Sequence, residues 1–196
     1  MVNSNLKKGG ILMKRAGLIV LFIGVLLLCT NTYVLGEVED SLDLSQYQDK
    51  VSELGVPTLD SVTGLKNQAI QTFESGDYEQ ALPLLEDWAK QANWLANLIS
   101  GGLEPFYSAS YDDRKEFPYS KISILVSYES TANDLKTQRD HSLVMQAECL
   151  SHLGNKKDAV ARYMKALDLI GIDDWEWWVR ATNGLYEIIG IPSMKE

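Results

Sequence analysis

Cysteine and histidine are both scarce in this sequence, with two residues of each among 196. Cys29 lies in an apolar N-terminal segment, and Cys149 lies in the body of the chain. If that segment is removed after export, Cys149 has no partner, so an intramolecular disulfide is excluded and packing must hold the fold. Free cysteines are among the most often buried residues, and we expect Cys149 to be a small buried side chain.

Metal and catalytic motifs are also missing. His141 and His152 lie eleven residues apart, with Cys149 three residues before the second, but a metal site needs three or four converging ligands. The sequence has no glycine-rich phosphate loop, no HExxH motif and no nucleophile elbow. We therefore expect no metal, no cofactor and no catalytic activity.

Acidic residues are absent from residues 1–36, which hold four basic ones. Residues 37–196 therefore hold 14 of the 18 basic residues and all 27 acidic residues, a net charge of −13. Such a surface repels phosphate backbones and anionic lipid headgroups. This excludes nucleic acid as an expected partner and leaves the leader as the only part expected to meet a membrane.

Residues 1–36 have the layout of a secretory signal peptide. A basic pair precedes an unbroken apolar run, residues 16–29, and Val34 and Gly36 supply β-branched and small residues before a cleavage point at Glu37. We therefore expect a secreted or otherwise extracytoplasmic protein. The run is short for a membrane span of about 20 residues, but residues 16–35 reach that length, so an uncleaved membrane anchor is an alternative.

The start of the chain has two interpretations. The codons for residues 7–10 can spell a purine-rich ribosome-binding sequence just before Met13. We hypothesise that Met13 is the true start, that residues 1–12 are untranslated and that the source is bacterial. The alternative is that residues 1–12 belong to a long basic leader, and the intact mass of the precursor distinguishes the two.

Residues 37–58 form an acidic linker, and a helical domain is expected over residues 59–196. Apolar residues in the linker fall at helical spacing before Gly55, which fits either a short amphipathic helix or a tether. The last helix of the domain is expected to begin near Trp175, with the acidic pair Asp173 and Asp174 as its cap.

Two stretches of the helical domain repeat one pattern. An apolar stripe ends at Gly76, where Asp77 can cap the next helix, and a second stripe ends at Gly154. With the two glycines aligned, the matched pairs are Leu65 with Leu143, Gln68 with Gln146, Ala69 with Ala147, Ala81 with Ala159 and Leu85 with Tyr163. The first helix of the pattern occurs a third time, at an offset of 35 residues from Leu143, Gln146, Ala147 and Leu150. The matching residues are Trp178, Ala181, Thr182 and Leu185.

This pattern resembles the tetratricopeptide repeat (TPR), a helical hairpin of about 34 residues. The resemblance implies an all-α, TPR-like helical-hairpin solenoid of two to three units, in which small residues let paired helices approach. Departures are that Gln68 and Gln146 replace a usual leucine, and that Gly154 follows Gly76 by 78 residues, ten more than two periods. We therefore expect a further unit between the hairpins that is degenerate or carries an insertion, residues 101–120.

In tetratricopeptide proteins, first-helix residues that do not pack on the second helix line a concave groove. The resemblance therefore implies a protein- or peptide-binding scaffold. The matching groove positions are Lys66, Ile70, Phe73, His141, Val144, Glu148, Ser151, His152, Asn183 and Tyr186. Glu148 and His152 lie opposite the apolar stripe, so we expect both to be exposed.

The tyrosine-rich insertion supports an alternative function. It holds Asp112, Asp113 and Arg114 among aromatic residues, so a small-ligand receptor or a cryptic enzyme built around residues 101–120 is the competing hypothesis. A closed pocket that holds these three side chains would favour it, and an open groove would favour the scaffold.

Three tryptophans, Trp175, Trp177 and Trp178, are dense for one helix. They either cover the end of the solenoid or present an aromatic anchor to a partner.

Overall fold

The structure is a computed structural model that describes residues 43–194. The expected signal peptide and the Met13 start lie outside the described residues. The chain divides into two units, residues 1–45 and 46–196, and the second is described below. The all-α prediction is confirmed for the described residues. The helices are α2 Ser45–Leu54, α3 Leu59–Glu74, α4 Tyr78–Gly102, α5 Tyr119–His152, α6 Lys156–Leu167 and α7 Trp175–Ile189, with a 3-10 helix at Asp113–Glu116.

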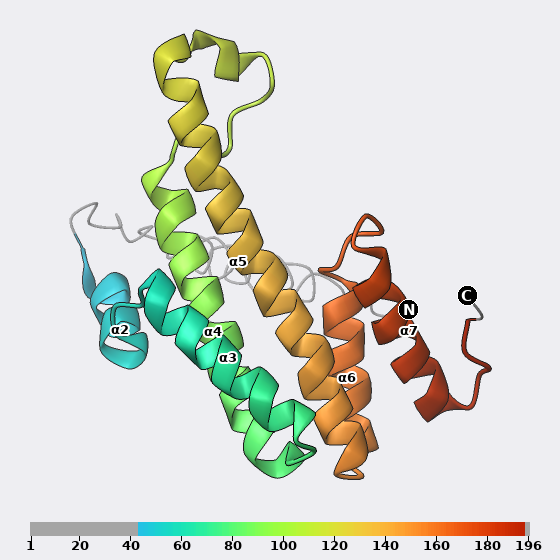
Figure 1. Ribbon diagram of the computed structural model, residues 1–196. Helices are drawn as coiled ribbons and strands as arrows, with labels where there is room; N and C mark the ends of the chain where they lie inside the picture. The colour runs from blue at the N-terminus through green and yellow to red at the C-terminus, as the bar shows by residue number, and fades with distance from the viewer. Residues whose placement is uncertain (1–42, 195–196) are drawn as a thin grey trace, which may run out of the picture. The chain divides into compact units, whose positions relative to one another are not determined.

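The helices from α3 to α7 pack in chain order. Each one contacts the next, and α5 also contacts α7 (Figure 1). Helix α5 therefore has neighbours on several faces, which places the α3–α4 hairpin and the pair α6 and α7 around one long helix. No helix within residues 43–194 is both long and apolar enough for a membrane span.

The two turns aligned from the sequence have the same geometry. Gly76 and Gly154 have φ angles of 81° and 79°, in the left-handed region that glycine enters without steric cost. Asp77 and Asn155 then accept a hydrogen bond from the backbone N–H three residues ahead and cap α4 and α6. The predicted cap at Asp77 is confirmed.

Small residues lie where the paired helices meet. They are Ala69, Ala81, Ala147 and Ala159, all fully buried. The larger buried residues form two clusters, one around Trp88 and the other around Tyr163. Trp177 of α7 packs against both clusters, so α7 is tied to both parts of the core.

The segment between the two turns differs from the prediction. We expected a further helical unit there, but residues 78–152 form one long hairpin of α4 and α5, which have 25 and 34 residues. The extra residues lengthen these two helices and do not build a separate helix pair. Gly101 and Gly102 end α4, and Pro118 precedes the first turn of α5, where its missing N–H costs no helical hydrogen bond.

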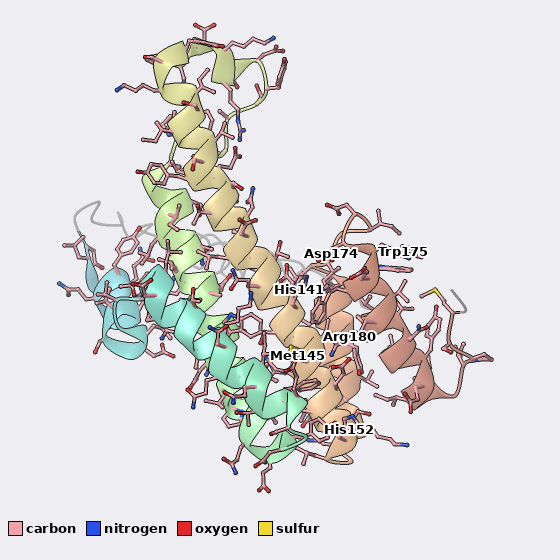
Figure 2. The ribbon with its side chains drawn as sticks, in the orientation of Figure 1. His141, Met145, His152, Asp174, Trp175 and Arg180 are labelled. Carbon is pink, nitrogen blue, oxygen red and sulfur yellow. The ribbon has the colours of Figure 1, made fainter. Side chains whose placement is uncertain are left out.

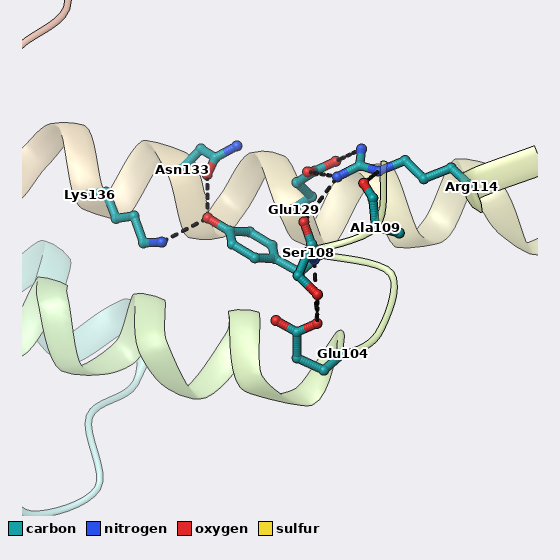
Figure 3. A network of polar contacts seen from close by, with 8 residues as sticks. Glu104, Ser108, Ala109, Arg114, Glu129, Asn133 and Lys136 are labelled. Carbon is teal, nitrogen blue, oxygen red and sulfur yellow. Dashed lines mark hydrogen bonds and ion pairs between the residues drawn. The ribbon is translucent and has the colours of Figure 1, made fainter. Parts of the chain in front are cut away.

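Residues 103–118 cap the tip of this hairpin. Phe106 is buried and packs edge-on against Phe117, with ring centroids 5.2 Å apart. Arg114 donates hydrogen bonds of 2.9 and 2.6 Å to the carboxylate of Glu129 on α5, and two more to backbone carbonyls of the loop (Figure 3). The hydrogen bonds to Glu129 raise the pKa of Arg114. The insertion therefore uses several of its aromatic and charged side chains to hold its own shape.

Of the two expectations for the linker, a short helix or a tether, the structure shows the helix, α2. None of the residues of α2 is buried. Its C-terminal end is held on α4 by two side-chain hydrogen bonds. Gln91 donates to the carbonyl of Leu54 at 2.9 Å, and the indole N–H of Trp94 donates to the carbonyl of Gly55 at 3.2 Å. The ammonium nitrogen of Lys50 in α2 also lies 5.9 Å from the ring centroid of Trp94, so α2 is attached to α4 by polar and cation–π contacts.

Cys149 is fully buried in the cluster around Trp88, as predicted. Burial raises the pKa of its thiol from 9.0 to about 12, which suppresses the reactive thiolate. Because the folded-state pKa lies above the unfolded value, the thiol stabilises the fold fully below about pH 9, and this contribution is lost as the pH rises toward 12.

We expect iodoacetamide to label the peptide that carries Cys149 slowly in the folded protein and rapidly in guanidinium, measured by mass spectrometry. A Cys149→Ala variant should also lose less unfolding free energy than the parent as the pH is raised from 9 toward 12. Equal labelling rates in the two states would contradict the burial of this side chain.

Candidate functional site

A cleft of about 400 Å³ opens between α3, α4, α5 and α7. Its volume falls in the range of about 300–1,000 Å³ that is typical of ligand sites. Its lining is aromatic, aliphatic and charged side chains from all four helices. They are Lys66, Ile70, Phe73, Glu74, Trp88, Gln138, His141, Met145, Trp177 and Arg180.

Arg180 lines the cleft beside two aromatic rings. Its guanidinium carbon lies 4.5 Å from the ring centroid of Trp177 and 5.9 Å from that of Phe73, within the range of cation–π contacts. The same guanidinium donates two hydrogen bonds of 2.6 Å to the carboxylate of Glu148, a bidentate pair. Hydrogen bonding to Glu148 raises the pKa of Arg180. The pair therefore joins α7 to α5 at the edge of the cleft.

His141 makes a second link between the same two helices. Its ring stacks on Trp177 with centroids 4.1 Å apart, and its Nε2 lies 2.5 Å from Oδ2 of Asp174 (Figure 2). Asp174 occupies the N-cap position of α7, but its side chain makes no capping hydrogen bond. The acidic pair Asp173 and Asp174 therefore lies at the start of this helix as predicted, but the carboxylate of Asp174 contacts His141 and not the first backbone N–H groups.

The α3 side of the cleft carries Lys66. Its ammonium nitrogen lies 5.9 Å from the ring centroid of Trp88, whose side chain is buried beneath. The cleft therefore combines aromatic and charged side chains, and two of the residue types in it, tryptophan and arginine, are enriched in binding hot spots.

Four predicted groove residues line this cleft, namely Lys66, Ile70, Phe73 and His141. Two others are wrongly placed by the prediction. Val144 has no exposed surface, because its face of α5 is covered in the cluster around Tyr163. The side chain of Glu148 is only 18% exposed, because Arg180 pairs with it from α7.

The remaining predicted residues lie outside the lining of the cleft. His152 is exposed as predicted, and its ring stacks on Tyr78 with centroids 4.1 Å apart. The side-chain oxygen of Asn183 accepts a hydrogen bond from the backbone near the C-terminus. Ser151 and Tyr186 are half-buried. The structure therefore does not gather the two histidines at one site.

Sequence reasoning did not assign several lining residues to the groove. The tryptophan cluster did carry a signal for Trp177, whose side chain packs against both core clusters and also lines the cleft. Trp175 is more than half exposed. Arg180 and Gln138 fall outside the aligned stripes, so the repeat pattern holds no signal for them.

Within residues 43–194, no three or more His, Cys, Asp or Glu side chains gather so that they could hold a metal ion. The chain matches no family model, no curated protein and no solved structure. Its function must therefore be inferred from its own geometry.

Proposed function

We propose that this protein is an extracytoplasmic binding scaffold without catalytic activity, which captures a protein or peptide in the cleft between α3, α4, α5 and α7. The observation that carries the proposal is the lining of that cleft, where Phe73, Trp177 and Arg180 lie together. Tryptophan and arginine are among the residues that contribute most binding energy at protein interfaces, and they do so in well-packed pockets.

The repeat geometry supports a TPR-like interpretation of the fold. The α3–α4 hairpin and the junction of α5 with α6 share a left-handed glycine, a capping side chain and buried alanines. In this interpretation α3, the C-terminal half of α5 and α7 are the first helices of successive units. All three contribute side chains to the cleft, as the resemblance implies for a concave groove.

The alternative, a receptor or enzyme built around residues 101–120, has less support. Arg114 is engaged by Glu129, and Asp112 pairs with Lys115 at 2.7 Å. Asp113 accepts a hydrogen bond of 2.7 Å from the hydroxyl group of the nearby serine. Both aspartates are exposed, so these groups do not converge on an enclosed space.

The extracytoplasmic location rests on the leader sequence. A protein cleaved before Glu37 would be released, whereas an uncleaved chain would stay anchored through residues 16–35. In both cases the folded part would meet its partner outside the cytoplasm, and the acidic surface would keep that part away from anionic lipids.

A comparison of captured proteins tests the proposal. The full chain is immobilised, exposed to an extract of the source cells, and the retained proteins are quantified by mass spectrometry. Lys66→Glu combined with Gln138→Trp fills the cleft and reverses one edge charge at two half-buried positions. We expect this variant to lose a defined set of proteins by about tenfold or more while its melting temperature is kept.

The matched control is Lys157→Glu combined with Gln71→Trp, which makes the same chemical changes at two exposed positions away from the cleft. This control should capture the same proteins as the parent. If the cleft variant and the parent retain identical proteins in equal amounts, the cleft is not the binding surface and the proposed function is wrong.

A further inference from the structure

A second cleft lies between α4, α5 and α6, with a volume of about 520 Å³. It shares α4 and α5 with the first cleft but uses another face of α5, because successive helical residues turn by about 100°. Arg139 and Gln146 line the second cleft, whereas His141 and Met145 line the first. The two clefts are therefore separate sites on one long helix.

The second cleft is basic in a strongly acidic protein. Four cationic side chains line it, namely Lys90 from α4, Arg139 from α5, and Arg162 and Lys165 from α6. Glu86 is the one acidic residue in the lining. Residues 37–196 have a net charge of −13. A cluster of four cationic side chains is therefore unusual for this chain.

Two of these cations are held in place by polar partners. Arg162 donates hydrogen bonds of 2.7 Å to Glu86 and to the side-chain oxygen of Gln146. Arg139 donates bonds of 2.7 Å to Asp140 and to the side-chain oxygen of Asn93. Side chains that are ordered in this way lose less conformational entropy when a ligand binds.

A buried network anchors the base of the cleft. Gln146 and Ser142 have no exposed surface, and both donate to the backbone carbonyl of Leu85 on α4, at 3.1 and 2.7 Å. The family that this chain resembles usually has leucine at the position of Gln146. Here the side-chain amide of Gln146 donates to the backbone of α4 and accepts a hydrogen bond from Arg162. Glutamine in place of leucine therefore helps to shape the cleft.

The other two cations are Lys90 and Lys165. Both are exposed, and neither forms an ion pair within the described part of the chain. They stand on α4 and α6, the two helices that flank α5. A ligand that neutralises both lysines needs more than one negative group, and those groups must be spaced along it.

We propose that this cleft binds an acidic peptide segment of a partner protein. The inference rests on the proposed scaffold function and names the chemistry of a partner. Successive carboxylates along an extended peptide would pair with Lys90 and Lys165, while the fixed guanidinium of Arg139 or Arg162 would orient a further acceptor. A short peptide held in this cleft would interact mainly with the nearby lysines, because charges more than about 8 Å away are largely screened at physiological salt. A nucleic acid or a membrane would instead meet the wider acidic surface.

Fluorescence anisotropy at physiological salt tests the inference, with a labelled octapeptide of alternating glutamate and serine as the probe and the full chain as the receptor. Lys90→Glu combined with Lys165→Glu should weaken binding by about tenfold or more. The control is Lys156→Glu combined with Lys157→Glu, which changes the net charge equally at exposed positions of α6 outside the cleft. It should keep the affinity within about twofold of the parent.

Three results would overturn the inference. The parent could fail to bind the peptide, the two variants could lose affinity equally, or inorganic phosphate could bind at the cleft in place of the peptide. The second result would make overall charge the cause, and the third would make the site a phosphate site. The Lys66→Glu and Gln138→Trp variant changes only the first cleft and should bind the peptide normally, so failure of one proposal is distinguishable from failure of the other.

Discussion

Replacing Gly184 by alanine should lower the free energy of unfolding by about 1–3 kcal/mol, because it overpacks the contact between α6 and α7. A β-carbon at this position would lie 2.3 Å from the hydroxyl oxygen of Tyr163 and 2.4 Å from the ring carbon that bears it. Tyr163 is buried in the second core cluster, so its ring cannot move aside without disturbing other contacts. Thermal unfolding should show a loss of about 2–4 °C per kcal/mol for a chain of this size.

The matched control is the same substitution at Gly64 of α3. A β-carbon there would meet no atom within 4 Å, and glycine inside a helix is less stable than alanine by about 0.5–1 kcal/mol. Gly64→Ala should therefore raise the melting temperature while Gly184→Ala lowers it. A change of the same sign at both positions would mean that Tyr163 does not pack against Gly184.

Replacing Glu148 by lysine should destabilise the protein by about 1–3 kcal/mol. This lies between the small contribution of an exposed ion pair and the larger cost of leaving one charge of a buried pair without its partner. The side chain of Arg180 is 40% exposed and that of Glu148 is 18% exposed, so the loss is partly offset by water. A lysine at position 148 would also place two cations together where α5 meets α7.

The charge swap provides the decisive comparison. Glu148→Lys combined with Arg180→Glu restores opposite charges and should recover part of the lost stability, which a double-mutant cycle measures by denaturant unfolding. Glu187→Lys reverses a charge on an exposed residue of α7 and should change the stability by less than about 0.5 kcal/mol. If Glu148→Lys changed the free energy of unfolding as little as this control, the ion pair between Glu148 and Arg180 would not stabilise the fold.

The prediction for Glu148 illustrates what the repeat pattern could and could not supply. Spacing along one helix placed this residue opposite the apolar stripe, and that position alone predicts that its side chain is exposed to solvent. Arg180 covers it from α7, 32 residues later in the chain. The prediction that Val144 lines the groove was wrong for the same reason, because a helix that packs against neighbours on several sides has more than one buried face.

The Gly76 to Gly154 interval shows a second limit. An excess of ten residues over two periods is compatible with an extra unit, an insertion or longer helices. The buried residues of α4 run on to Ala96, and those of α5 begin at Ala132. The two helices pack against each other, so these parts of the longer helices bury apolar surface without a new turn. Helical periodicity cannot separate these outcomes, because each one satisfies it locally.

The sequence by itself determined the local features of this protein. The helical stripes, the glycine turns at Gly76 and Gly154 and the cap at Asp77 depend on interactions within a few residues, and the structure has them where they were expected. The tertiary structure alone decided which charges are paired and which faces of α5 form clefts. Those outcomes depend on side chains far apart in the chain, such as Arg180 with Glu148 and Arg162 with Glu86, and pairing over such separations leaves no periodic trace in the sequence.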